Sequence, residues 1–260
     1  MSSDNGYISD YLIHWAGRDK SPEERVSVLS RIVTDCRLRL TRNEFFFNGS
    51  LKFDEEMVCF TDVPLARSQQ HCAKYSQFGI AFYKKQLMGK GAQPVFYFTH
   101  VFKKDMGRIH RFVIEQLKNS TIAPDVLRAL HRQIYFTQQF AEGPADRHDI
   151  AYYEREWRIG PFSLKREGQD FLEWYSEHDR LTPITGILVT EGDEQYFKFE
   201  QADVAFLIAP NQFIAQISNP HQFAVKSYES LVKQTPVLFR LSSWLCRLLR
   251  KKATFLFSPS

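Results

Sequence analysis

Between residues 21 and 36 the apolar positions follow the period of an α-helix. Ser21 is placed to cap this segment, Pro22 suits its first turn, and Glu24 completes a capping box with Ser21. The apolar positions that share one face are Val26, Leu29, Val33 and Cys36. The pattern therefore predicts a helix that packs this face against a core.

Short apolar and aromatic runs bounded by Gly or Pro predict β-strands along much of the remaining chain. The predicted strands cover residues 57–65, 79–83, 94–100, 154–159, 185–190, 195–199 and 203–209. A helix is expected over 66–78, and a loop or a short helix over 84–93. No internal repeat is evident, so these elements are expected to build one domain.

Residues 101–142 depart from the strand pattern. They contain two segments of helical character, and Pro124 lies near the start of the second. We expect a helical insertion between strands here, followed by a polar loop over 142–149. The order of elements predicts an α+β fold with a mixed or antiparallel sheet and one helical insertion.

The charge is unevenly placed along the chain. The 260 residues carry a formal net charge of +4, with 34 basic and 30 acidic residues. Residues 231–260 hold six of the basic residues and none of the acidic ones, which leaves 28 basic against 30 acidic, a net charge of −2, in residues 1–230. The body of the protein therefore offers no electrostatic argument for binding DNA or RNA.

Residues 231–260 are expected to form a basic amphipathic segment that follows a domain of residues 1–230. Leucines recur in it at helical spacing, namely Leu238, Leu241, Leu245, Leu248 and Leu249. Such a segment can pack on its own domain, contact an anionic membrane surface or dock on a partner protein, and the sequence leaves these three alternatives open.

The cysteine usage and the N-terminal residues indicate a cytoplasmic protein. The four cysteines show no CxxC pair and no spacing typical of a disulfide framework. The first residues are polar and acidic, where a signal peptide would carry a basic and then an apolar run. No stretch reaches the ~18–20 apolar residues of a membrane span.

Three places along the chain carry candidate chemistry. His14 lies among aromatic residues just before the predicted helix, and Tyr75 precedes the strand at 79–83. Glu154 and Glu156 are two residues apart in a predicted strand, so they share one face of it. Two carboxylates would be costly against an apolar core, so this face is expected to meet water or a polar cavity.

Each place also has a simpler interpretation. His14 suits a half-buried histidine whose ring is hydrogen-bonded, and Tyr75 suits ordinary core packing. The acidic face suits a solvated strand with Arg155 and Arg158 as neighbours. The sequence contains no HExxH, no Walker A loop, no GxSxG and no GxGxxG motif, and no metal site is expected.

The order of His14, Tyr75 and Glu156, each beside a predicted strand, resembles the His–Tyr–Glu triad of ADP-ribosyltransferase-like folds. The resemblance implies a split mixed or antiparallel β-sheet that clamps NAD, which is the substrate rather than a resident cofactor. A carboxylate in such a site stabilises the oxocarbenium-like transition state formed when the nicotinamide–ribose bond breaks.

The same resemblance assigns roles to individual residues. Glu156 would be the catalytic carboxylate, and Glu154 would orient the acceptor. Tyr75 would pack on the nicotinamide and His14 would hold a ribose hydroxyl. The pyrophosphate would meet the guanidinium of Arg18 or Arg158.

A second resemblance covers roughly residues 7–160. The phrases VCFTDVPL, HCAKYSQFGIAFYKKQL, GAQPVFYFTH and YEREWRI are similar to the conserved blocks of abortive-infection proteins of the AbiGi type, from bacterial phage defence. That family is described as the antitoxin half of a two-gene system. This resemblance implies a role in phage defence and a cognate toxin or antitoxin as partner.

Two functions follow from the two resemblances. The first is an NAD-consuming ADP-ribosyltransferase effector that transfers ADP-ribose to a macromolecule, with RNA or DNA among the acceptors considered, or that hydrolyses NAD. The alternative is a non-catalytic antitoxin or interaction protein of an abortive-infection system.

Overall fold

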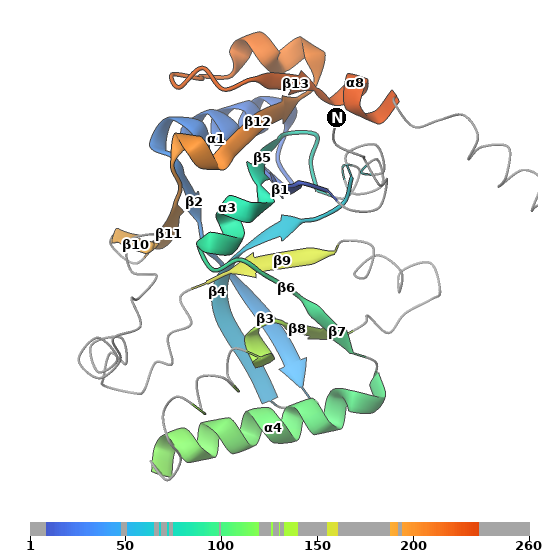
Figure 1. Ribbon diagram of the computed structural model, residues 1–260, viewed down its shortest axis with the longest axis vertical. Helices are drawn as coiled ribbons and strands as arrows, with labels where there is room; N and C mark the ends of the chain where they lie inside the picture. Colours follow the sequence, from blue (N-terminus) through green and yellow to red (C-terminus); the bar gives the residue numbers. More distant parts are fainter. Residues whose placement is uncertain are drawn as a thin grey trace, which may run out of the picture.

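The computed structural model describes residues 9–47, 51–64, 68, 72, 75–98, 100–119, 126, 130, 133–139, 155–160, 188–191 and 194–233. Within these residues the chain forms strands and helices in mixed order, and most strands join one large sheet (Figure 1). Glu154, the loop expected at 142–149, most of the helix expected over 66–78, and residues 234–260 lie outside the described residues.

The large sheet has eight strands in the order β13-β12-β5-β1-β4-β9-β6, with β3 paired to β4 beside this path. Neighbouring strands run antiparallel except β12 and β13, which are parallel, so the sheet is mixed. The strands are β1 Tyr11–Trp15, β3 Thr41–Phe47, β4 Leu51–Thr61, β5 Gly79–Tyr83, β6 Gln93–Pro94, β9 Glu156–Ile159, β12 Val204–Ala209 and β13 Val225–Ser227.

Two smaller sheets complete the strand structure. One has the order β10-β11-β2, with β10 Leu188–Glu191, β11 Glu194–Lys198 and β2 Arg37–Arg39, all antiparallel. In the other, β7 Phe96–Phe98 pairs in parallel with β8 Thr137–Gln139. The strand β4 is eleven residues long, and its first half pairs with β3 while its second half pairs with β9 and reaches β1.

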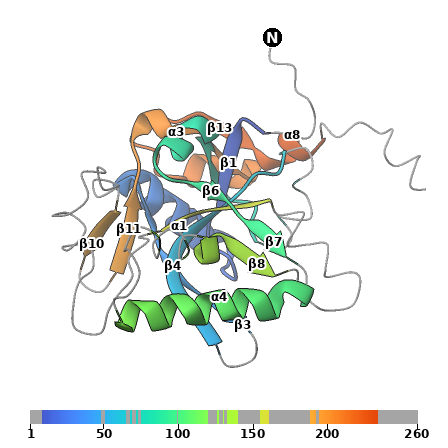
Figure 2. The same cartoon turned by 60° about the horizontal axis from the view of Figure 1, so that its bottom comes forward.

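The helices surround these sheets. They are α1 Pro22–Asp35, α3 Lys84–Gly89, α4 His100–Asn119 and α8 Tyr228–Lys233, with short 3-10 turns at Gln201–Asp203 and Asn211–Gln216. Two views show α4 lying across one end of the molecule, near β3 and the start of β4 (Figures 1 and 2). No helix in the described part of the chain is long and apolar enough to cross a membrane.

The helix α1 forms as its sequence predicts. The Ser21 hydroxyl accepts a hydrogen bond from the Glu24 backbone N–H at 3.3 Å, and the Glu24 carboxylate accepts one from the Ser21 backbone N–H at 2.8 Å. Cys36 ends the helix in the left-handed conformation, with φ of 49°. The buried face holds Val26, Leu29 and Val33.

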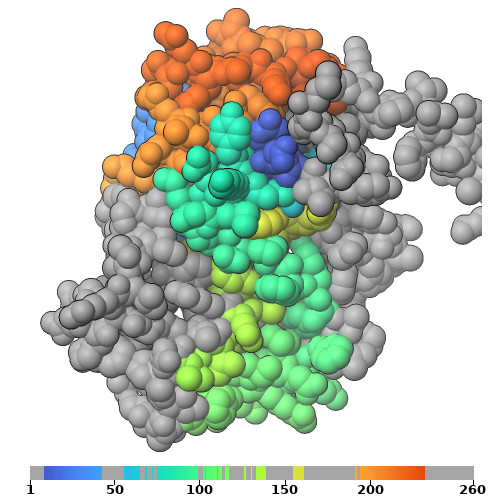
Figure 3. All heavy atoms as spheres, viewed as in Figure 1, coloured from blue at the N-terminus to red at the C-terminus, as the bar shows by residue number. Residues whose placement is uncertain are grey.

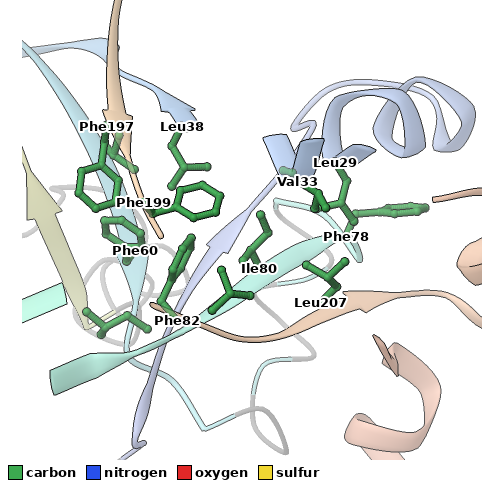
Figure 4. Packing of buried hydrophobic residues seen from close by; sticks show 14 of the residues in the cluster. Leu29, Val33, Leu38, Phe60, Phe78, Ile80, Phe82, Phe197, Phe199 and Leu207 are labelled. Atoms are coloured by element: carbon green, nitrogen blue, oxygen red, sulfur yellow. The ribbon is translucent and has the colours of Figure 1, made fainter. Parts of the chain in front are cut away.

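Because side chains alternate along a strand, the large sheet has two distinct faces. We call the face that bears Leu12, Phe60 and Ile80 the first face, and the face that bears Ile13, Ala81 and Phe206 the second face. The first face packs on α1, on Leu38 of β2 and on Phe197 of β11, and it carries the largest core (Figure 4).

Aromatic rings fill this core. Phe60 meets the rings of Phe82 and Phe197 edge to face, with centroids 5.8 and 6.4 Å away, and Phe82 meets Phe199 at 5.1 Å. Edge-to-face contact is a favoured geometry for aromatic pairs, and each fully buried Phe side chain contributes roughly 1.5–3 kcal/mol by leaving water. The chain has 23 phenylalanines, and several of them fill this core.

Several expected elements differ from the observed ones. The strand expected at 57–65 begins at Leu51 and ends at Thr61, and the run expected at 94–100 divides into β6 and β7 before α4 begins at His100. The expectation of a wholly helical insertion over 101–142 is wrong at residues 137–139, which form β8 and pair with β7. The strands β1, β2, β3 and β13 are not among the predicted ones.

Candidate functional site

Glu156 and Arg158 form an ion pair along the strand β9. They are two residues apart, so their side chains emerge on the same side of the strand. Arg158 donates from Nε to Glu156 Oε1 at 2.9 Å and from Nη2 to Glu156 Oε2 at 3.2 Å. Both carboxylate oxygens of Glu156 are thus engaged by one guanidinium, in the two-pronged geometry that suits arginine.

Arg158 also ties β9 to the start of β8. Its Nη1 donates to the backbone oxygens of Tyr135 and Thr137 at 2.8 and 3.2 Å, and its Nη2 donates to Gln138 Oε1 at 2.6 Å. The side chain of Arg158 is 0% exposed, and that of Glu156 is 14% exposed. The pair therefore sits inside the protein and joins two segments that are distant in sequence.

Arg158 stays protonated although it is buried. Burial opposes the charged form, but the attraction and the hydrogen bonds of the Glu156 carboxylate outweigh it, so the pKa of Arg158 lies above its ordinary value. A guanidinium without exposed surface cannot contact the pyrophosphate of a ligand that binds from solution. The cofactor-binding role expected of Arg158 stays a prediction, which this burial does not favour.

His14 lies on the other face of the sheet from Glu156. The register pairs Ile13 with Thr61 and Thr61 with Glu156, which places Glu156 on the second face. His14 alternates with Ile13 and therefore points to the first face, where its ring meets that of Phe60 edge to face at 6.0 Å. The sheet itself thus separates the imidazole of His14 from the carboxylate of Glu156.

The local contacts of His14 are those of a core histidine. Its Nδ1 lies 3.1 Å from the backbone oxygen of Cys59, and a neutral ring with the proton on Nδ1 can donate this bond. Burial lowers the pKa of His14, and the hydrogen bond to Cys59 opposes this only in part. The ring is therefore held neutral at physiological pH.

Tyr75 and Arg18 are brought together. The guanidinium of Arg18 lies 5.2 Å from the centroid of the Tyr75 ring, and Tyr75 packs against the second-face cluster that includes Ile13, Trp15 and Cys72. The structure thus groups Tyr75 with Arg18 on the second face, and leaves His14 on the first. Glu154 lies outside the described residues.

A second polar cluster was not expected from the sequence. The buried Asp62 accepts hydrogen bonds from Lys84 Nζ at 2.8 Å on each carboxylate oxygen, and Arg155 Nη2 lies 3.9 Å away. Arg155 adopts a left-handed backbone with φ of 44°, and its backbone oxygen accepts a bond from the Asp62 N–H at 3.2 Å. The only signal in the sequence is an acid just beyond a strand end and a lysine just beyond another.

A cysteine and a histidine also meet near the end of α1. Cys36 Sγ lies 3.3 Å from His221 Nε2, and His221 Nδ1 lies 2.7 Å from Gln201 Nε2. Burial raises the pKa of the Cys36 thiol, and the Asp35 carboxylate raises it further. The thiol is thus protonated at neutral pH and lacks the thiolate character of an activated nucleophile.

Metal binding has no support in the described part of the chain, where no three His, Cys, Asp or Glu side chains gather in a way that could hold a metal ion. The ionisable clusters of the large sheet are instead internally paired, as with Glu156 and Arg158 or Asp62 and Lys84. Arg158 joins β9 to the segment of β8, and the Asp62–Lys84 pair joins the residue after β4 to the first residue of α3.

A family model described as "Putative abortive phage resistance protein AbiGi, antitoxin" matches residues 49–209, more than half of the chain. The chain belongs to this family. Comparison with curated proteins found no match, and neither did comparison with solved structures. The matched range contains β4, β5, β9 and β12, the central strands of the large sheet with β1.

The family match corrects the first of the two expected functions. An NAD-consuming ADP-ribosyltransferase effector is contradicted, because the family is described as an antitoxin, which agrees with the alternative of a non-catalytic antitoxin. The resemblance to ADP-ribosyltransferases finds no support in any comparison. The expectation that NAD is a substrate stays a prediction.

Proposed function

We propose that this chain is the antitoxin of an abortive-infection system and that it acts by binding the toxin encoded beside it, without catalysis. The observation that carries the proposal is the match of residues 49–209 to an antitoxin family. The toxin is accordingly the cognate partner, and we take the action to occur in the cytoplasm, in line with the cysteine spacing.

The arrangement of the polar residues supports a non-catalytic role. Catalytic groups must converge on one reacting atom, but His14 and Glu156 lie on opposite faces of the sheet. Both carboxylate oxygens of Glu156 also accept hydrogen bonds from Arg158. A carboxylate fixed in this way stabilises the fold and is poorly placed to meet a ligand.

Co-expression tests the proposal. Cells that express the neighbouring toxin gene alone should stop growing, and cells that also express this chain should grow. Expression of this chain alone should be harmless. The proposal fails if the chain itself arrests growth, or if it does not relieve the arrest while it accumulates as folded protein.

A variant of Tyr75 distinguishes binding of the toxin from consumption of NAD. Tyr75→Phe keeps the ring and its contact with Arg18 but removes the hydroxyl, so it should rescue growth as well as the natural chain. Cellular NAD should be the same with and without the chain. A fall in NAD that depends on this chain would show that it acts as an enzyme.

A further inference from the structure

A cysteine, a histidine and a glutamine form a chain of polar contacts beside the end of α1. Cys36 Sγ lies 3.3 Å from His221 Nε2, and His221 Nδ1 lies 2.7 Å from the amide nitrogen of Gln201. A nucleophile, a base within hydrogen-bond reach and a third group that orients the base are the pattern of an activated nucleophile. We call these three residues the thiol site.

The fold brings the members of the thiol site together from segments that are distant in sequence. Cys36 caps α1, Gln201 begins a 3-10 turn, and His221 lies in the turn before β13. The backbone N–H of Ser218 donates to Ser30 Oγ at 3.0 Å, which fixes the segment before His221 on α1. In Figure 1 the orange segments near β12 lie against α1, and in Figure 3 blue and orange atoms lie side by side at the surface there.

The turn that carries His221 is held by its own contacts. The Asn219 side chain accepts a hydrogen bond from the Phe223 N–H at 3.0 Å and donates one to the Phe223 backbone oxygen at 2.8 Å. Gln222 closes the turn in a left-handed conformation, with φ of 56°. The imidazole of His221 packs on the Phe223 ring, with centroids 5.6 Å apart. Because these contacts fix the imidazole beforehand, the base is already in position beside the sulfur.

Cys36 occupies a backbone position that usually holds glycine. It ends α1 in the left-handed conformation, with φ of 49° and ψ of 44°, where a residue with a Cβ is strained. Residues held in such conformations cluster at functional sites. The side chains of Cys36 and His221 are half-buried and that of Gln201 is exposed, so the thiol site reaches the surface.

At rest the thiol site holds a protonated thiol. Burial and the Asp35 carboxylate raise the pKa of Cys36, although Arg37 Nη2 pairs with Asp35 at 3.3 Å. Attack by the sulfur therefore requires that the thiol proton leave as the new bond forms. His221 Nε2 is placed to take this proton, as a histidine does for a serine hydroxyl that is likewise protonated at rest.

The Gln201 amide determines which nitrogen of His221 carries the proton. With the amide nitrogen facing Nδ1, Nε2–H points at the sulfur, and the thiol donates to the Val33 backbone oxygen at 3.6 Å. Half a turn of this exposed amide places its oxygen at Nδ1 instead. The ring proton then sits on Nδ1, and Nε2 is free to accept the thiol proton. Gln201 is therefore a positioning residue, and His221 is the base.

We propose that Cys36 is a site of reversible thiol–disulfide exchange with a small disulfide, and that His221 acts as its base. A half-buried sulfur is open to a small molecule, and a disulfide exchanges with a thiol without any further oxidant. The thiol proton passes to His221 Nε2, the Cys36 sulfur bonds to one sulfur of the small disulfide, and the bond between its two sulfurs breaks. The departing sulfur takes the proton from His221, which leaves a mixed disulfide on Cys36 and a free small thiol. Excess small thiol reverses the step, and the inference does not depend on the proposed antitoxin function.

The experiment treats the reduced, full-length chain with dithiodipyridine, a small disulfide, and measures the rate at each cysteine by mass spectrometry of peptides. His221→Gln replaces the base by a side chain of similar size, so the rate at Cys36 should fall about tenfold or more. The control Gln222→Asn changes the same turn, keeps the base and suits the left-handed backbone, so its rate should stay within about twofold of the natural one. The rate at Cys59, which is also half-buried, should be the same in all three chains. Circular dichroism with thermal unfolding confirms that each variant folds.

A pH series separates a base from a purely structural contact. A thiol that ionises unaided reacts about tenfold faster for each pH unit up to its raised pKa, but a thiol with a base beside it reaches a plateau at lower pH. The rate at Cys36 of the natural chain should level off between about pH 6 and 9, and that of His221→Gln should keep the steep rise. Gln201→Leu should slow the reaction several-fold and keep the plateau, because the base remains without its orienting partner.

Three results would overturn the proposal. The first is an equal or faster reaction at Cys36 in His221→Gln. The second is a steep rise in the natural chain through the whole pH range, which needs no variant to observe. The third is a natural chain in which Cys59 reacts and Cys36 does not.

Discussion

The ion pair of Glu156 and Arg158 predicts a large and specific stability effect. Arg158 is fully buried, and its guanidinium makes hydrogen bonds to the Glu156 carboxylate, to two backbone oxygens and to the Gln138 side chain. Arg158→Met removes all of them and leaves a partly buried carboxylate without its cation. Breaking a buried pair in this way costs about 3–5 kcal/mol.

A double-mutant cycle isolates the pair itself. Glu156→Leu leaves the guanidinium with its neutral acceptors alone, and the double variant removes both charges. Because the double variant buries no unpaired charge, it should lose less free energy of unfolding than the two single variants summed, by about 2–3 kcal/mol. The backbone oxygens of Tyr135 and Thr137 stay without their donor in every variant that lacks Arg158.

Urea unfolding followed by tryptophan fluorescence measures this cycle, since Trp157 lies between the two residues in β9. For a chain of this length a loss of about 3–5 kcal/mol corresponds to a fall in Tm of roughly 6–20 °C. A coupling free energy near zero, with Arg158→Met as stable as the natural chain, would refute the structural role of the pair.

Three further effects follow from the structure. Gly160→Ala should lower the free energy of unfolding by about 1–3 kcal/mol, because its Cβ would clash with the Tyr135 hydroxyl, and adding Tyr135→Phe should recover part of the loss in the same urea assay. Ser21→Ala should cost about 1 kcal/mol of stability through the lost cap of α1, measured by thermal unfolding. Because burial lowers the pKa of His14, the unfolded chain gains a proton there first as the pH falls. Stability should therefore drop below pH ~6.5, the ordinary histidine value, and His14→Gln should reduce that drop in urea unfolding at pH 5 to 8.

The elements predicted correctly from sequence are those fixed by local interactions. The capping box and the apolar face of α1 are contained within sixteen residues, so the pattern alone locates the helix. The strands at 79–83 and 203–209 are apolar runs with clear ends, and β5 and β12 form there, with β12 beginning one residue later than expected. In contrast, β8 lies in a helical pattern and becomes a strand only by pairing with the distant β7.

The candidate site depends on pairing that the sequence does not show. The alternation rule correctly places residues two apart on one side of a strand, but the pair that matters is Glu156 with Arg158, an acid and a base, rather than two acids. The face on which His14 lies is set by the register of β1 against β4 and β5. That register brings together residues more than forty positions apart, which no local pattern encodes.

The most direct test of the account is a titration of this chain into the purified toxin, with the residual activity of the toxin as readout. Neutralisation by binding predicts that activity falls in proportion to the added chain and vanishes near one equivalent. Loss of all toxin activity at a small fraction of an equivalent, with a rate that depends on added NAD, would contradict a non-catalytic antitoxin.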